Sequence, residues 1–226
     1  MPTVAHPRRP VHADRVMTRI VIADDHAVVR KGLRLILADA EELTVAGEAA
    51  SADELLTLLR TRPVDAVILD VGLGDRDGIE VLKQIRAAFP RLPVLMMSMY
   101  SEDVYAIRAL RSGASGYIEK SAAPELLLAA VRRIVAGGKW VSAAMTERLT
   151  AMIGSESVGS LPHERLSDRE FEVFRLLGKG KSVTEIARAL NLSVKTVSTH
   201  RMHILAKTGL ETNAGIVDYV ISNGLR

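Results

Sequence analysis

Five polar side chains follow apolar segments of the chain, each at the point where its segment ends. Three are carboxylates, one is a hydroxyl group and one is an ammonium group: Asp24, Asp25, Asp70, Ser98 and Lys120. Paired carboxylates are the oxygen ligands that a hard cation such as Mg²⁺ takes. A further carboxylate could attack phosphorus, while the metal and the ammonium group offset charge on the transferred oxygens. These residue types predict an acyl phosphate at Asp70.

A parallel α/β sheet would bring these side chains together. Short apolar segments alternate with helical patterns over the first part of the chain, which favours parallel strands joined by helices. The predicted strands are residues 18–23, 44–49, 66–70, 94–98 and 116–119. Ligands bind such sheets at the carboxyl ends of the strands, and right-handed crossovers give a doubly wound, flavodoxin-like fold. We therefore expect one site at one edge of the sheet.

Each of these residues also has a simpler explanation when it is taken alone. Asp24 and Asp25 could cap the first helix, and Lys120 could be solvated. Their joint position at one edge favours the site. There Ser98 would donate a hydrogen bond to the new phosphate, which carries roughly −1.5 to −2 charges. An inward shift of this hydroxyl could let the ring of Tyr117 move, although a lone tyrosine on a strand is often a packing residue.

The composition excludes several classes of protein. The 226 residues contain no cysteine, which rules out disulfides and thiolate metal sites. No apolar segment approaches the ~20 residues that span a bilayer, so we expect a cytoplasmic protein without a membrane partner. Residues 1–16 lack the apolar centre of a secretory signal and are predicted to be a disordered extension, so Met17 could be the natural start.

The last part of the chain has the pattern of a small helical domain. A polar, glycine-rich stretch predicts a linker with a short helix over residues 142–162. Capping signals then open three helices, at Ser167 with Glu170, Ser182 with Glu185, and Ser193. A short helix, a tight turn and a longer basic helix over residues 194–207 indicate a helix-turn-helix.

This longer helix has residues that could read DNA. Residues 175–207 contain seven Lys or Arg and one acid, Glu185, which raises the expectation of nucleic-acid binding. One face could enter a major groove, with side chains at helical spacing: Lys195, Ser198, Thr199 and Met202. Phosphate contacts could come from Lys179, Lys181, Lys195, Thr196 and Arg201. The simpler alternative is a helical bundle with a solvated basic face.

The spacing along the first part of the chain matches a known family. Asp70 follows Asp25 by 45 residues and precedes Ser98 by 28 and Lys120 by 50, with an Asp-Gly pair at 77–78. In these features residues 17–140 resemble the receiver domain of two-component response regulators. The resemblance implies Asp70 as phosphoacceptor, Lys120 as phosphate partner, and Ser98 and Tyr117 as switch residues. It implies Mg²⁺ ligands at Asp24, Asp25, Asp70 and the Gly72 carbonyl.

Residues 163–226 resemble the LuxR-type helix-turn-helix, through segments 166–170, 180–182, 185–187 and 193–200. Receiver plus this output domain is similar to the NarL/FixJ subfamily. That resemblance implies a bacterial transcription factor, fed by a histidine kinase, that binds paired half-sites of double-stranded DNA as a homodimer. The last helix could supply the dimer surface or could be core, at Val217, Tyr219 and Val220. Departures from the family patterns are Leu73, Gly74 (where proline is usual), Val183 and Thr208.

The resulting prediction is a DNA-binding regulator whose domains, 17–141 and 163–226, stay together until Asp70 is phosphorylated. No enzyme activity is expected beyond self-phosphorylation from small phosphodonors and autodephosphorylation. One alternative keeps DNA binding but makes the receiver a phosphorylation-independent interaction module. Another is a phosphohydrolase of the haloacid dehalogenase kind. That enzyme needs a second Asp two residues after the nucleophile, where this chain has Gly72.

Overall fold

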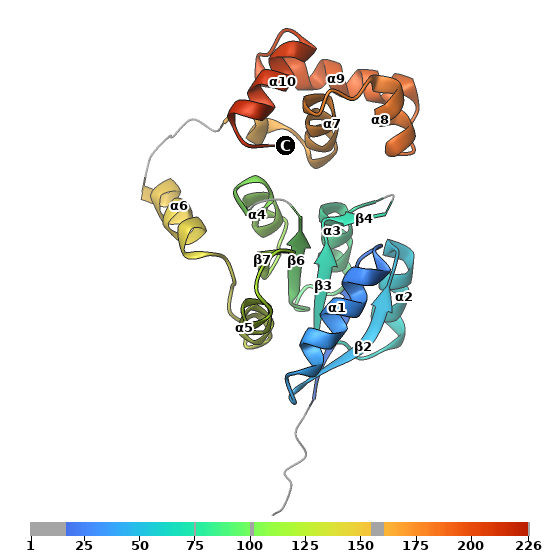
Figure 1. The fold of residues 1–226 in the computed structure, drawn as a ribbon, viewed down its shortest axis with the longest axis vertical. Helices are drawn as coiled ribbons and strands as arrows, with labels where there is room; N and C mark the ends of the chain where they lie inside the picture. Colours follow the sequence, from blue (N-terminus) through green and yellow to red (C-terminus); the bar gives the residue numbers. More distant parts are fainter. Residues whose placement is uncertain (1–16, 75, 100–101, 155–160, 226) are drawn as a thin grey trace, which may run out of the picture.

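A five-stranded parallel sheet forms the first part of the chain (Figure 1). The computed structural model describes residues 17–74, 76–99, 102–154 and 161–225. The strand order is β2-β1-β3-β6-β7, with β1 (Thr18–Ala23), β2 (Leu43–Ala49), β3 (Ala66–Asp70), β6 (Val94–Ser98) and β7 (Gly116–Glu119). This order confirms the predicted doubly wound, flavodoxin-like sheet. The extension predicted over residues 1–16 lies outside the described residues.

Helices cover both faces of this sheet because strand side chains alternate between two apolar layers. One layer contains Val21 and Leu69 and packs against α2 (Ala52–Thr61), α3 (Gly78–Ala88) and α4 (Glu102–Arg111). The other contains Ile20 and Ile68 and packs against α1 (Ala27–Ala38) and α5 (Pro124–Val135). Both faces of the sheet are therefore apolar, and polar chemistry is confined to the strand ends.

Two features of the backbone were not predicted from the sequence. The loop after β3 contains a short antiparallel pair, β4 (Gly72–Leu73) with β5 (Arg76–Asp77). At the outer edge of the sheet, Trp140 forms a parallel bridge with Gly116. The Tyr117 N–H donates to the Trp140 carbonyl at 3.0 Å, and the Trp140 N–H donates to the Ser115 carbonyl at 3.0 Å. The chain after α5 thus covers part of β7.

The remaining elements are helical. They are α6 (Ala143–Gly154), the 3-10 turn η1 (Pro162–Arg165), α7 (Asp168–Gly178), α8 (Val183–Ala189), α9 (Val194–Thr208) and α10 (Asn213–Ser222). Both predicted capping boxes are present, Ser167 with Glu170 and Ser182 with Glu185, and Ser193 accepts the Thr196 N–H. At Ser51 only half of a capping box is formed, because the Glu54 carboxylate accepts from the Ala50 N–H and not from the Ser51 N–H.

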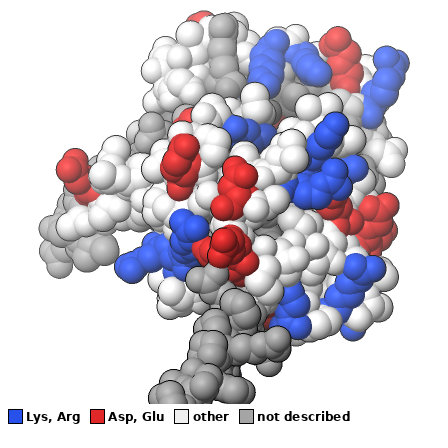
Figure 2. Space-filling model, turned by 60° about the horizontal axis from the view of Figure 1, so that its bottom comes forward, with Lys and Arg blue, Asp and Glu red and all other residues white. Residues whose placement is uncertain are grey.

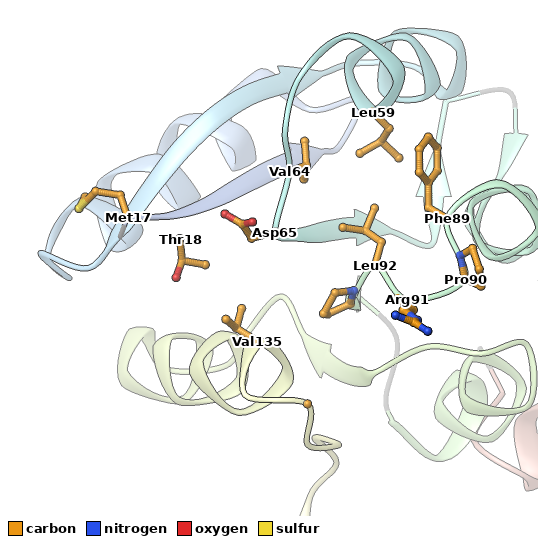
Figure 3. Close-up of a pocket in the computed structure, with 12 residues that line it drawn as sticks. Met17, Thr18, Leu59, Val64, Asp65, Phe89, Pro90, Arg91, Leu92 and Val135 are labelled. Atoms are coloured by element: carbon orange, nitrogen blue, oxygen red, sulfur yellow. The ribbon is translucent and has the colours of Figure 1, made fainter. Parts of the chain in front are cut away.

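The opposite end of the sheet, where the strands begin, is not the expected place for chemistry. Acidic and basic side chains are interspersed there (Figure 2), and some form ion pairs such as Arg19 with Asp65 and Arg132 with Glu42. A hollow of about 740 Å³ also lies at this end, lined by residues that include Thr18, Asp65 and Pro93 (Figure 3). In parallel sheets ligands bind at the other edge. Among the described residues, no helix combines the length and apolar character needed to cross a bilayer.

Candidate functional site

Three carboxylates converge at the carboxyl ends of β1 and β3. Asp24 and Asp25 directly follow β1, and Asp70 is the last residue of β3. Asp24 and Asp70 are 1% and 5% exposed, whereas Asp25 is exposed. One ligand atom from each of them, together with one from His26, lies within 4.8 Å of the others. The fold therefore assembles the acidic cluster that the spacing predicts.

Lys120 connects two of these carboxylates from the end of β7. Its Nζ lies 2.6 Å from Asp24 Oδ2 and 2.7 Å from Asp70 Oδ2, and its side chain is only 7% exposed. Burial lowers the pKa of Lys120, but its close contacts with both carboxylates outweigh burial, so the pKa is raised overall. Burial raises the pKa of Asp70 although the Lys120 hydrogen bond opposes it. Lys120 is thus a buried cation held beside the proposed phosphoacceptor.

His26 is a member of the cluster that the sequence prediction missed. Its N–H donates to Asp24 Oδ1 at 2.8 Å, and its ring Nδ1 lies 2.6 Å from Asp25 Oδ1. This N–H contact involves Asp24 alone and lies just before α1, whose N-cap is His26 without a side-chain cap hydrogen bond. The signal for His26 was its position directly after the two acids, where a ring can reach both carboxylates.

The loop after Asp70 depends on two glycines. A Cβ atom at Gly78 would lie 2.1 Å from the Asp70 carbonyl oxygen, so only glycine lets α3 begin directly against the end of β3. Gly74 has a φ of +63°, and its N–H donates to the Gly72 carbonyl at 3.0 Å. Proline, the usual residue of the family here, can adopt neither feature. The turn at Gly74 therefore requires a residue that has an N–H and can adopt a positive φ.

The donor set of this site fits a hard divalent cation. The ligand atoms are carboxylate oxygens, and Mg²⁺ prefers one or two carboxylates together with phosphate oxygens and water. Asp24 Oδ2 is buried and makes no hydrogen bond of good geometry, although the Lys120 ammonium is in ion contact with it. The Gly72 carbonyl keeps one lone pair beyond its bond with Gly74. These oxygens can accept a cation without any buried donor losing a hydrogen bond.

Ser98 and Tyr117 lie on neighbouring strands and contact each other. Ser98 ends β6 and is 2% exposed, and Tyr117 of β7 is 1% exposed. The Tyr117 hydroxyl is hydrogen-bonded to Ser98, and burial raises its pKa well above the ordinary value. The sequence predicts that Ser98 bonds a phosphate. In this structure Ser98 is hydrogen-bonded to Tyr117, the residue predicted to move with it.

The second predicted site is the outer face of α9. Val197 and Ile204 are fully buried, which turns the four residues expected to read DNA outward: Lys195, Ser198, Thr199 and Met202 are all exposed. The hydroxyls of Ser198 and Thr199 donate to carbonyls one turn back, at 2.9 Å and 3.0 Å. Their oxygens can therefore still accept, and the helix presents a small polar face to solvent.

Other predicted DNA contacts are partly engaged within the protein. Thr196 shares a 2.7 Å hydrogen bond with Ser193, and Arg201 Nε donates to Asn213 Oδ1 of α10 at 2.6 Å. Lys181 is exposed at the start of the helix pair. On α10 Val220 is fully buried, and Tyr219 packs on Phe174 and hydrogen-bonds with His163. These two residues of α10 therefore belong to the core.

Two protein-family models match the two parts of the chain. The response regulator receiver domain matches residues 20–132, and the luxR family of bacterial regulatory proteins matches residues 164–220. The match therefore includes the acidic cluster in one part and α9 in the other.

Known response regulators match this chain over almost their whole length. The response regulator UvrY of Escherichia coli K12 is 30% identical over 92% of this chain and 96% of its own. The oxygen regulatory protein NreC of Staphylococcus haemolyticus is 36% identical over 92% and 98%. A structure of RcsB from Salmonella enterica serovar Typhimurium, bound to promoter rprA in the presence of phosphomimetic BeF3⁻, has a TM-score of 0.65 at 30% identity, covering 90% and 98%. The chain belongs to the two-component response regulators of the NarL/FixJ type, with a receiver and a LuxR-type DNA-binding output.

Proposed function

We propose that Asp70 accepts a phosphoryl group from a partner histidine kinase and thereby controls how α9 binds paired half-sites in promoter DNA. The observation that carries this proposal is the position of the buried Asp70 carboxylate between Lys120, at 2.7 Å, and the acidic pair that follows β1. Carboxylates that pack so closely repel one another unless a cation joins them. The cluster is thus suited to binding charge from outside the chain.

Each residue has a defined part in the transfer. One Asp70 oxygen bonds to phosphorus while the bond from phosphorus to the kinase imidazole breaks, and that nitrogen keeps the electron pair. Lys120 can pair with the negatively charged phosphoryl group, because Asp70, the carboxylate that it already contacts, becomes the phosphorylated residue. Asp24, Asp25, Asp70 and the Gly72 carbonyl would hold Mg²⁺, which supplies positive charge beside the phosphoryl oxygens.

The output is DNA binding through the exposed face of α9. RcsB, which is similar over most of the chain, binds promoter DNA and has also been solved as two dimers on two parallel DNAs. By analogy, two copies of this chain would place two α9 helices in successive major grooves. Lys195, Thr196, Arg201 and Lys181 would contact phosphates, while Ser198, Thr199 and Met202 would meet base edges. A cytoplasmic location follows from this role.

Two alternatives predict different behaviour. A phosphorylation-independent receiver is favoured by one observation, the Gly72 carbonyl already bonded to Gly74. In that case DNA binding would not respond to a phosphodonor. A phosphohydrolase would turn over phosphate esters, but Gly72 stands where its second Asp is needed. We propose no catalysis beyond self-phosphorylation from small donors and autodephosphorylation.

Mass spectrometry after incubation with acetyl phosphate and Mg²⁺ tests the proposal. We expect one added phosphoryl group on the wild-type chain and none on Asp70→Asn. Asp53→Asn is the matched control, because the Asp53 carboxylate is exposed on α2. Undiminished labelling of Asp70→Asn would refute Asp70 as acceptor.

A further inference from the structure

Arg108 of α4 holds the start of the DNA-binding part against the receiver. Its guanidinium donates to the Leu166 carbonyl at 2.9 Å and to the His163 carbonyl at 2.6 Å. The same group lies 4.2 Å from the centre of the Phe171 ring, at cation–π distance. A single side chain of the receiver thus contacts η1, the turn after it and α7.

Arg175 of α7 makes the reciprocal contact from the DNA-binding part. It is 4% exposed, and it donates to the Tyr105 hydroxyl at 2.9 Å and to the Leu225 carbonyl at 2.9 Å. The Tyr105 ring packs edge-on against Phe171, with ring centres 5.6 Å apart. Hydrogen bonds from a buried guanidinium are strong because the donor is charged. Tyr105 is therefore the receiver residue through which Arg175 is held.

This contact continues to the switch pair of the receiver. Tyr105 of α4 and Tyr117 of β7 belong to the same buried cluster, in which α4 packs against β7, and Tyr117 is hydrogen-bonded to Ser98. A small hollow of about 160 Å³ lies between the two parts and is lined by residues that include Val71, Gly72 and Tyr105. Val71 and Gly72 directly follow Asp70. Changes at Asp70 therefore have two short routes to α7.

The same arrangement leaves the face of α9 that is predicted to read DNA exposed to solvent. In Figure 1, α7 lies between α4 and α9, so that α9 is on the side away from the receiver. Met202 is 61% exposed, and Lys195 and Thr199 are exposed as well. Docking onto the receiver thus uses α7 and η1 and leaves the predicted base-reading residues accessible.

We propose that the Tyr105–Arg175 contact is a latch that controls the pairing of DNA-binding domains and not the access of α9 to DNA. The proposal rests on the proposed function. Half-sites lie about 34–36 Å apart, so both helices must reach a defined separation and direction. A latched DNA-binding domain has a fixed orientation relative to its receiver. A released domain, tethered by its linker, can search for the second half-site.

The latch opens through the switch pair. When the Ser98 hydroxyl turns to a phosphate on Asp70, Tyr117 loses its partner and can move. Tyr105 then changes position, which weakens its bond with Arg175. The charge added at Asp70 thereby releases the DNA-binding domain from the receiver.

Tyr105→Phe tests the latch because it removes the hydroxyl and keeps the ring on Phe171. Tyr219→Phe is the matched control, since the Tyr219 hydroxyl bonds His163 within the DNA-binding part. The chain has no cysteine, so spin labels at Asp39→Cys and Glu211→Cys give a single distance by double electron–electron resonance. Without phosphodonor we expect one narrow distance in the wild type and in Tyr219→Phe, and a broad distribution in Tyr105→Phe. A narrow distribution in Tyr105→Phe would overturn the latch.

DNA-binding measurements distinguish an effect on the pairing of two DNA-binding domains from an effect on the access of α9 to DNA. The probes are a duplex selected from random DNA by the phosphorylated wild type and the same duplex with one half-site scrambled, at fixed salt. Without phosphodonor, Tyr105→Phe should bind the paired duplex about tenfold more tightly than the wild type and the single half-site within twofold. An equal gain on both duplexes would mean that the latch blocks access and would refute the proposal. A wild-type chain that ignores the phosphodonor on the paired duplex would instead refute the proposed function.

Discussion

Lys120 Nζ lies 2.7 Å from Asp70 Oδ2, although the two residues are 50 positions apart in the chain. Two parallel strands, β3 and β7, end at the same edge and bring them together, with β6 between them. The contact joins a buried cation to the carboxylate that we propose as phosphoacceptor. Its first consequence concerns stability in the absence of metal.

Lys120→Met should destabilise the metal-free protein. The substitution leaves the buried Asp24 and Asp70 carboxylates without their cation, and loss of one partner from a buried ion pair typically costs about 3–5 kcal/mol. Urea unfolding with and without Mg²⁺ measures the effect, and Mg²⁺ should reduce the difference because it supplies positive charge to the same oxygens. Equal stability of variant and wild type without Mg²⁺ would contradict the pairing.

Asp70→Asn should change how stability depends on pH. The pKa of Asp70 is raised mainly by burial, so the folded protein holds its proton to higher pH than the unfolded chain does. Ionisation of Asp70 therefore lowers the free energy of unfolding as pH rises from the ordinary value of 3.8 through the raised folded-state pKa. Urea unfolding across this window without Mg²⁺ should show a fall in the wild type that is smaller in Asp70→Asn. Parallel pH profiles would contradict the raised pKa.

Gly78→Ala should damage the phosphorylation loop. The added Cβ would meet the Asp70 carbonyl oxygen at 2.1 Å, so β3 and α3 must separate at a cost of roughly 1–3 kcal/mol. We expect lower stability and slower labelling by acetyl phosphate. Gly32→Ala is the control, because nothing lies within 4 Å of a Cβ there, and alanine in mid-helix should stabilise by about 0.8–1 kcal/mol. Normal labelling of Gly78→Ala would refute the close approach.

The double variant Ser198→Ala with Thr199→Ala should lose sequence preference and keep salt-dependent binding. Their hydroxyl oxygens face solvent on α9, whereas we propose that phosphate contacts come from charged neighbours such as Lys195. Affinities for the selected duplex and for a random duplex, each measured over a range of salt, should converge. The slope of log affinity against log salt concentration should change little. Lys195→Ala is the comparison and should reduce the slope by about one. An equal loss by the double variant on every duplex would show that these residues only position the protein.

Much of this structure could be predicted because its signals are local or periodic. Ser167 with Glu170 and Ser182 with Glu185 specify helix starts over four residues each. The carboxyl-terminal residues of the strands reveal the site because a parallel sheet aligns those ends whatever the intervening sequence. Asp70 and Lys120 were therefore predicted to be neighbours from strand periodicity, the strand ends and the family spacing.

The remaining features depend on contacts that leave no pattern in the sequence. Tyr105 and Arg175 are 70 positions apart, and each sits on a helix whose apolar periodicity would be the same with or without the contact. The β4–β5 pair is two residues long on each side, too short for alternation. His26 could be noticed only by asking which side chains reach the acids, since histidine at a helix start has many ordinary explanations.

The bridge between Trp140 and Gly116 has a practical consequence. Trp140 is the sole tryptophan of the chain, and its carbonyl accepts a hydrogen bond from the N–H of Tyr117, which we propose as a switch residue. Indole emission therefore originates beside the strand that would respond when Asp70 is modified. The protein carries its own optical reporter, and stopped-flow fluorescence can time the rearrangement of β7 without any introduced dye.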